Sequence, residues 1–273
     1  MERISLGRLA VHHTGYCVQM DEDQPAATPA VDRTLTLLWR RALGEPQGSR
    51  GPRQRVSVDE VVGAGIALAD AEGLMAFSMR KVADRLGLGV MSLYTYVPGR
   101  SELIGLMVDE VAGDVDYREH RGSLRDRMTV VAWQSWDEFH RHPWLLHVQK
   151  ARPWIGPNIS ERYEWQLAAI EGIGLDDLEM DHTIAVLTGF AESSARASIE
   201  AAGARTESGM TDRQWWEINA PVLARLMADG TYPISRRVGQ VAGEEYNSMG
   251  DPARSFEFGL ARIIDGVEAL LRR

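Results

Sequence analysis

The sequence predicts an all-α protein, built from a small three-helix head and a larger helical-bundle body. Apolar residues recur three and four positions apart along most of the chain, which is the spacing of an amphipathic helix. No alternating pattern of useful length indicates a β-strand. Glycine and proline separate the helical stretches. From these observations we expect a flexible N-terminal extension over 1–50, the head over 51–105 and the body over 106–273.

The N-terminal extension begins with a stretch that has little tendency to fold. Asp21–Ala30 combines acidic residues with alanine and proline, which is the composition of a solvated linker. One short helix is expected over Val31–Leu43, where leucines supply an apolar face. The segment Gly44–Pro52 ends this helix, because it is rich in glycine and proline.

Serine caps and glycines delimit the first two helices of the head. Ser57 is expected to cap the first helix, since two acidic residues follow it in the first turn, where they suit the helix dipole. Gly73 ends that helix. Ser78 then caps a second, shorter helix, which runs through Leu86.

A glycine turn leads from the second helix into the third. Gly87 forms the turn, the third helix spans Val90–Tyr96, and Pro98 ends it. Ser101 is expected to cap a fourth helix. A short helix, a glycine turn and another short helix, with the small Ala83 where the two cross, predict a helix-turn-helix unit. An ordinary αα-hairpin in a helical protein is the alternative.

The remainder of the chain is expected to be helical throughout, with proline and glycine at the breaks. The expected helices are approximately 123–141, 158–172, 177–206, 211–228 and 253–272.

The acidic charge of the chain is concentrated in the body. The formal net charge is -9, but residues 50–100 hold seven basic residues against five acidic ones, a net charge of +2. This balance argues against indiscriminate nucleic-acid binding and is compatible with local DNA contact by the head.

The composition also excludes several classes of protein. The single cysteine, Cys17, excludes a disulfide framework and a cysteine-based zinc site. Three histidines lie close together, but no set of histidines and carboxylates has metal-ligand spacing, so no metal is expected. Met1–Ala10 lacks the features of a secretory leader, and no run of about 18 apolar residues occurs. We expect a cytoplasmic protein without a membrane partner.

The stretch Ser78–Val97, with the helix before it and the turn after it, resembles the DNA-binding head of the TetR family of bacterial regulators. The shared pattern is a Gly-x-x-x-x-Ser link, a basic second helix, Leu-Gly-Leu-Gly, and Leu-Tyr-x-Tyr-Val before the turn. Family members usually carry lysine at the position of Arg100, so this residue departs from the pattern while keeping the charge. The resemblance implies a helix-turn-helix DNA-binding head and a body that binds a ligand and dimerises.

Chemistry and the family pattern together suggest which residues meet the DNA backbone. Tyr94 and Tyr96 lie where an aromatic ring can pack on sugar and its hydroxyl can donate to phosphate. Arg100 is placed to meet a phosphate beside free helix N–H groups. Ser78 is expected mainly as a cap that can also touch phosphate. Packing of the tyrosines within the head, and a solvated role for Arg100, are the alternatives.

The expected recognition helix lacks Arg, Asn and Gln, so it cannot form the bidentate pairs that dominate base recognition. Arg80, early in the second helix, is the guanidinium best placed for a guanine edge, and DNA shape is expected to supply further specificity. The residues expected to contact thymine methyls or form single hydroxyl bonds are Val90, Met91, Ser92 and Thr95.

Arginines in the extension allow two interpretations. They could form an arm that enters the adjacent minor groove, or they could be incidental residues of a solvated tail. These residues are Arg40, Arg41, Arg50, Arg53 and Arg55.

The body is rich in large aromatic side chains, which suggests an apolar pocket with a few polar anchors. Each of them could equally be ordinary core. By resemblance, the pocket lies between the helices at 123–141, 158–172 and 177–206 and binds a lipophilic drug-like or natural-product molecule. The residues expected to line it are Trp133, Trp136, Phe139, His140, Trp165 and Phe190.

The resemblance also implies a homodimer that binds double-stranded DNA at an inverted repeat, with a bundle formed by 177–206 and 253–272 of each copy. The apolar residues expected to be exposed there are Leu187, Phe190, Ile263, Ile264, Val267 and Leu270.

The function expected from these features is that of a repressor that a small effector releases from its operator. A helical ligand-binding protein or an enzyme that uses the aromatic pocket is the alternative. The chain shows no G-x-S-x-G, phosphate-loop or HExxH motif, so neither catalytic residues nor a cofactor are expected.

Overall fold

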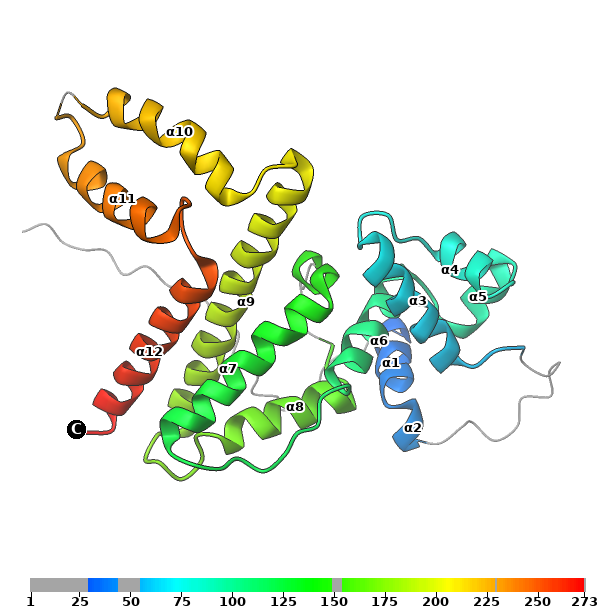
Figure 1. Cartoon of the computed structure of the whole chain (residues 1–273). Helices are drawn as coiled ribbons and strands as arrows, with labels where there is room; N and C mark the ends of the chain where they lie inside the picture. Colours follow the sequence, from blue (N-terminus) through cyan, green and yellow to red (C-terminus); the bar gives the residue numbers. More distant parts are fainter. Residues whose placement is uncertain (1–28, 44–54, 149–153, 229, 273) are drawn as a thin grey trace, which may run out of the picture.

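The computed structural model describes residues 29–43, 55–148, 154–228 and 230–272 (Figure 1). Within these ranges every regular element is a helix, so the predicted all-α fold is confirmed. In the same part of the chain no helix is long and apolar enough to span a membrane. The elements are α1 (Pro29–Leu38), α2 (Arg40–Leu43), α3 (Val58–Glu72), α4 (Met79–Arg85), α5 (Val90–Tyr96), α6 (Arg100–Ala112), α7 (Leu124–Arg141), the 3-10 helix η1 (Pro143–His147), α8 (Pro157–Ala168), α9 (Asp177–Ser208), α10 (Asp212–Leu226), α11 (Pro233–Tyr246) and α12 (Pro252–Leu270).

The head is a compact unit of α3 to α6 around one apolar core. The predicted caps are confirmed: Ser57 forms a capping box with Glu60, and the Ser78 hydroxyl accepts from the backbone N–H of Lys81 at 3.3 Å. Gly87 adopts φ 64° in the turn between α4 and α5, a conformation that favours glycine. Leu93 of α5 is fully buried in this core.

The start of α6 differs from the prediction. Ser101 was expected to cap this helix, but the helix begins one residue earlier, at Arg100, and Gly99 is the N-cap. No side chain caps this end, so the serine contributes no cap. The expected boundary between head and body, after residue 105, falls inside α6, whose residues through Val111 pack into the head core.

The body has a second core, formed by α7, α9 and α12. In Figure 1 these three helices run side by side, and α8 lies below α7 on the side toward α6. α7 and α9 both begin with a capping box, Ser123 with Asp126 and Asp176 with Glu179. Phe256 of α12 is fully buried at the centre of this core.

α9 and α12 approach closely at a glycine. A Cβ atom at Gly259 would lie 2.2 Å from Cζ of Phe190, whose ring stacks on Phe256 with centroids 5.8 Å apart. We expect Gly259→Ala to lower the free energy of unfolding by about 1–3 kcal/mol, because the ring must shift in a packed core. Gly203→Ala is the matched control, since a Cβ at this site in α9 meets nothing within 4 Å; it should stabilise by about 0.5–1 kcal/mol. Urea denaturation distinguishes the two, and equal shifts would contradict the packing described.

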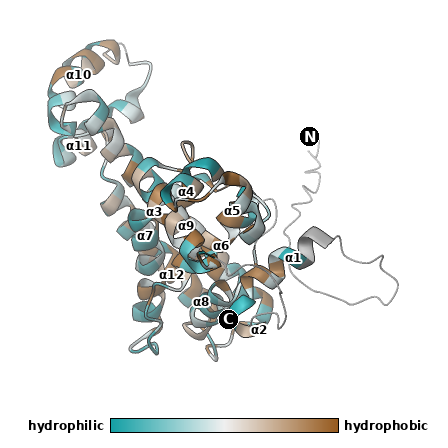
Figure 2. Cartoon of the chain, turned by 90° about the vertical axis from the view of Figure 1, so that its right-hand side faces the viewer, coloured by the Kyte–Doolittle hydropathy of each residue, from teal (hydrophilic) through white to brown (hydrophobic). Residues whose placement is uncertain are grey.

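α10 and α11 form a helical hairpin that stands away from the rest of the molecule (Figures 1 and 2). α11 is absent from the helices predicted from the sequence, which leave a break between residues 228 and 253. In the structure Pro233 occupies the first position of the helix, where its missing N–H costs no hydrogen bond. Apolar residues remain exposed on this hairpin: Ile218, Val222, Leu226, Ile234, Val238 and Val241.

Within the N-terminal extension, α1 and α2 pack on the head. Instead of one helix over Val31–Leu43, the structure shows α1 and α2 with a break at Trp39. Leu38 is fully buried in the core of the head. Residues 1–28 and 44–54, which contain Cys17, Arg50 and Arg53, lie outside the described residues, so the predictions made for them are not addressed.

Candidate functional site

The core of the head fixes the orientation of α5, the predicted recognition helix. Leu93 and Tyr96 face inward, and Val82 and Ala83 of α4 are fully buried beneath them. Val90 is half-buried against the same core. Because one side of α5 is held by packing, the opposite side is presented to solvent as a rigid surface.

The outward side of α5 carries most of the residues predicted to contact bases. Met91 is 80% exposed, and Ser92 and Thr95 are also exposed. The Thr95 hydroxyl donates to the Ser92 carbonyl at 2.7 Å, so the hydroxyl is partly satisfied within the helix. This surface offers apolar contact and single hydroxyl bonds, as the sequence predicted, and not bidentate recognition.

The two tyrosines of α5 do not play equivalent parts. Tyr94 is 39% exposed, whereas Tyr96 is 8% exposed and belongs to the core of the head. The prediction treated both as DNA-backbone contacts. For Tyr96 the structure supports the alternative, packing within the head, because inward-facing positions three residues apart share one side of a helix. Tyr94 keeps an accessible ring.

The three remaining head residues differ in how firmly they are held. The Arg80 side chain is 82% exposed and lies 4.0 Å from Asp84, one turn along α4. Ser78 caps α4, as expected. Arg100 is exposed, but its side chain is held in place: its Nη2 donates to the carbonyl of Leu74 at 3.0 Å, and its guanidinium lies 5.7 Å from the centroid of the Phe77 ring. Other N–H donors of this guanidinium remain for a phosphate.

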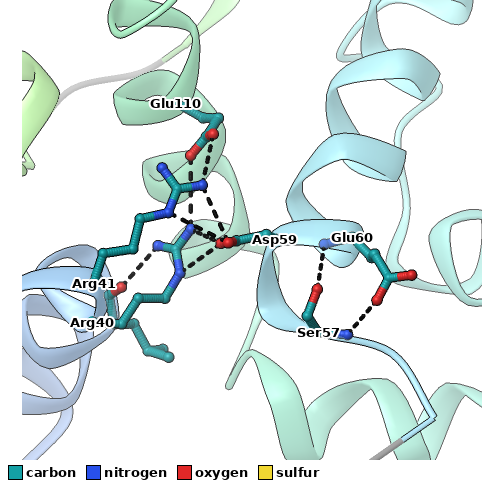
Figure 3. A network of polar contacts seen from close by, with 7 residues as sticks. Arg40, Arg41, Ser57, Asp59, Glu60 and Glu110 are labelled. Atoms are coloured by element: carbon teal, nitrogen blue, oxygen red, sulfur yellow. Dashed lines mark hydrogen bonds and ion pairs between the residues drawn. The ribbon is translucent and has the colours of Figure 1, made fainter. Parts of the chain in front are cut away.

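Arg40 and Arg41, two of the arginines predicted for a minor-groove arm, are held against the head. Both guanidinium groups are paired with Asp59 of α3 and Glu110 of α6 (Figure 3). The alternative, a solvated tail with incidental arginines, does not describe these two, because both have carboxylate partners. Arg55 is exposed, and no contact of its side chain tests either interpretation.

Four of the residues predicted to bind ligand gather around Phe256, between α7, α9 and α12. Trp136 stacks on Phe256 with ring centroids 4.5 Å apart, and Trp133 meets the same ring edge-on at 4.9 Å. Phe190 and His140 complete the group by stacking on Phe256 and Trp136. Trp136 and Phe256 are buried, so this aromatic cluster is also part of the core of the body.

The two other predicted ligand residues lie elsewhere. Phe139 is half-buried and packs against both cores, at the contact between head and body. Trp165 of α8 stacks on His120 with centroids 4.5 Å apart, and its indole N–H donates to the carbonyl of Arg118 at 2.7 Å. The six residues therefore do not form one pocket wall.

Trp165 lines a cavity of about 710 Å³ between residues 117–120, α8 and the starts of α7 and α9. The sequence prediction missed the other aromatic residues here, Tyr117, His120 and Tyr163. Spacing alone could not have found them, because the loop that carries two of them meets α8 only in the folded chain.

Two side chains of α7 carry buried polar atoms without a partner in the described structure. These atoms are Nε of Arg127 and both amide atoms of Gln134. The two residues are seven positions apart and so share one side of the helix, and Arg127 lines the cavity. Buried polar groups are normally hydrogen-bonded, so Nε of Arg127 is a candidate to receive a polar group of a ligand in the cavity.

α8 connects the cavity to the head. Asp109 of α6 is buried, and its carboxylate accepts from the backbone N–H of Ile159 at 3.0 Å in the first turn of α8. Burial raises the pKa of Asp109, although the backbone N–H donors of α8 oppose this effect. Farther along α8, Arg162 pairs with the buried Glu138 of α7 at 2.9 Å. A displacement of α8 would therefore reach α6 directly.

Comparison with known proteins identifies the family. Residues 118–271 match the family model described as the tetracyclin repressor-like C-terminal domain. The HTH-type transcriptional repressor DrrR1 of Streptomyces coeruleorubidus is 35% identical over 260 residues, which cover 94% of this chain and 93% of that protein. The chain belongs to the TetR family. The resemblance found in the sequence of the head is thus confirmed by relatives that span both parts of the molecule.

Solved TetR-family structures show the same fold. The structure of ActR from Streptomyces coelicolor with actinorhodin has a TM-score of 0.66 and 27% identity, covering 79% of this chain and 96% of that chain. ActR without ligand has a TM-score of 0.64 and 25% identity, covering 81% of this chain and 98% of that chain.

A second relative in sequence is an HTH-type transcriptional regulator of Saccharopolyspora erythraea. It is 33% identical over 134 residues, or 47% of this chain and 55% of that protein.

Membership of the TetR family decides between the functions that the sequence left open. TetR-family proteins are transcriptional regulators, so the alternative of an enzyme is not favoured. As a member of this family the chain is a transcriptional regulator.

Proposed function

We propose that this protein is a repressor that binds an inverted-repeat operator as a homodimer and leaves it when a lipophilic aromatic effector binds the body. The observation that carries the proposal is the physical connection between the two parts. A rigid recognition surface on α5 belongs to the same packed unit as α6, and Asp109 of α6 caps α8, which lines the cavity. A ligand that favours one position of α8 would favour one position of the head.

The DNA contacts that we propose follow the exposed surface of the head. Tyr94 and Arg100 would meet the sugar–phosphate backbone, with Ser78 close to it. Arg80 would meet a base edge, because its side chain extends into solvent beside α5. The residues proposed for methyl and hydroxyl contacts are Val90, Met91, Ser92 and Thr95.

Arg80→Ala is expected to weaken binding to the operator by about 1–3 kcal/mol and to leave binding to random DNA nearly unchanged. The side chain is exposed, so folding should not be affected. Fluorescence anisotropy with operator and random duplexes measures both affinities. Equal losses on the two duplexes would show that Arg80 contacts phosphate and not a base.

The homodimer that we propose uses α9 and α12, with two corrections to the expected surface. Leu187 and Ile264 are fully buried in the core of their own chain, so they are unable to face a partner. Phe190, Ile263 and Val267 are partly buried against the same core. Val186 of α9 and Phe258 of α12 are exposed apolar residues on the same two helices and are better candidates. A second copy would cover this surface and the exposed residues of the α10–α11 hairpin.

The proposed ligand class is supported by the chemistry of the body and by one relative. Aromatic walls beside buried, unpartnered polar atoms suit a flat molecule with several oxygen atoms. ActR has been solved with actinorhodin and with (S)-DNPA. We carry over only the class of molecule, a lipophilic aromatic compound, and propose Trp165 and Arg127 as its contacts. For Trp133, Trp136, Phe139, His140 and Phe190, a core role is favoured by their packing.

The experiment that tests release uses actinorhodin and (S)-DNPA as probes on the protein–operator complex. We expect a concentration-dependent fall in anisotropy as DNA is released, together with quenching of tryptophan fluorescence. Trp165→Ala should shift the midpoint to higher ligand concentration, whereas Trp215→Ala, on the α10–α11 hairpin, should not. If neither probe releases the DNA or quenches the fluorescence, that result would contradict the proposed ligand class.

A further inference from the structure

The segment 33–43, which comprises most of α1 and all of α2, is attached to both the head and the body; we name it the N-terminal clasp. Leu38 is buried in the core of the head. The indole N–H of Trp39 donates to the carbonyl of Ile155 at 2.9 Å, two residues before α8 begins. The clasp thus contacts the same junction at which Asp109 caps α8.

A network of four charged side chains fastens the clasp (Figure 3). Nε of Arg40 donates to Asp59 at 2.9 Å, and Nη2 of Arg41 lies 2.9 Å from Glu110 and 3.2 Å from Asp59. Burial alone would raise the pKa of Asp59, but the hydrogen bond from Arg40 and the charges of both arginines hold it below its usual range. Two cations and two anions on three elements therefore link the clasp to α3 and α6.

The location of this network argues against direct DNA contact. Glu110 lies ten residues beyond Arg100 on α6, or about 15 Å along the helix axis, away from the turn that follows the recognition helix. Both arginines already have carboxylate partners. A phosphate would have to compete with Asp59 and Glu110 for them. The charges of the clasp are therefore suited to hold protein elements together.

We propose that the N-terminal clasp sets the angle between head and body, and thereby the spacing of operator half-sites that the dimer accepts. This inference rests on the proposed function. Trp39, Arg40 and Arg41 are positioning residues: they touch no base, but they pin the head at a second point beside the α6–α8 contact. Two such points resist rotation of the head, whereas a single contact can act as a pivot.

The test is selection from duplexes that carry the wild-type half-sites separated by spacers of varied length. We expect the double variant Arg40→Ala/Arg41→Ala to select the same half-site sequence as the wild type, with the same salt dependence of binding. It should accept a broader range of spacer lengths. Its affinity for the wild-type spacing should fall roughly tenfold, within the usual range of coupling between sites. Arg40→Lys/Arg41→Lys keeps the charges and should restore most of the selectivity. Arg125→Ala removes ion pairs of α7 with Asp265 and Glu268 of α12, outside the head, and serves as the matched control.

Two further measurements keep the outcome decisive. Trp39→Phe removes only the indole donor and should broaden the accepted spacers even if the double alanine variant folds poorly. Hydrogen exchange at the first turn of α8 needs no DNA and should be faster in either variant. Unchanged spacer selection, or unchanged exchange, would overturn the inference.

A uniform loss of affinity with a smaller salt slope would instead show that the arginines contact phosphate. Failure of the proposed function is distinct, because the wild-type chain itself would then select no inverted repeat.

Discussion

Met91→Glu is expected to abolish specific DNA binding without destabilising the protein. Met91 is 80% exposed at the second position of α5, on the surface that faces away from the core of the head. An acidic side chain there would approach the phosphates of the major groove, and like charges brought together at an interface cost several kcal/mol, which is more than about 100-fold in affinity. An acidic residue in the first turn also suits the helix dipole, so α5 itself should not unfold.

Leu178→Glu is the matched control for this substitution. Leu178 also occupies the second position of its helix, α9, and is 67% exposed, but it lies in the body. Anisotropy with operator DNA, combined with circular dichroism, compares the two variants. We expect loss of binding only for Met91→Glu, with helical content retained in both. Full binding by Met91→Glu would show that this side of α5 does not enter the groove.

The largest expected effect on stability comes from Phe256→Ala, at about 3–5 kcal/mol of unfolding free energy. The Phe256 ring is fully buried and meets the rings of Trp133, Trp136 and Phe190. Its removal would leave a cavity where α7, α9 and α12 meet, and rigid aromatic neighbours are poorly able to fill it. Phe256→Leu keeps most of the volume and should cost less than about 1.5 kcal/mol.

Urea denaturation of these two variants also distinguishes core from pocket. If the aromatic cluster were a ligand site held open in the free protein, truncation to alanine would cost little, because few contacts would be lost. A loss below about 1 kcal/mol would therefore contradict the core role assigned to Trp133, Trp136 and Phe190. A loss in the expected range supports the assignment of ligand contacts to the cavity beside Trp165.

The parts of the fold that depend on residues close together in the sequence were predictable from the sequence. Caps at Ser57 and Ser78 follow from a side chain and the N–H group three residues later, so a local pattern is sufficient. The helix-turn-helix unit is equally local, since Gly87 and the apolar residues around it determine the turn. Ser101 shows the limit of such patterns, because a helix can also start without a side-chain cap.

Features that depend on distant residues were not predictable. Arg41 is paired with Asp59 and Glu110, which lie 18 and 69 residues away along the chain. No local sequence pattern therefore distinguishes an arginine that is paired within the protein from one on a DNA-binding arm. Local sequence also does not distinguish Trp136 from Trp165. Trp136 packs in the core of the body and Trp165 lines a cavity, and this difference arises only from tertiary packing. Sequence periodicity shows that an aromatic side chain is inward, but not what it meets there.

The most direct test of a dimeric DNA-binding repressor is selection of bound duplexes from a random pool by the wild-type chain at two salt concentrations. We expect an inverted repeat, with half-site centres about one helical turn or a multiple of it apart, enriched at both salt concentrations. Binding to random duplexes should fall steeply with salt, because it depends on phosphate contacts alone. Enrichment of no sequence, with all binding lost as the salt concentration rises, would contradict the proposed function.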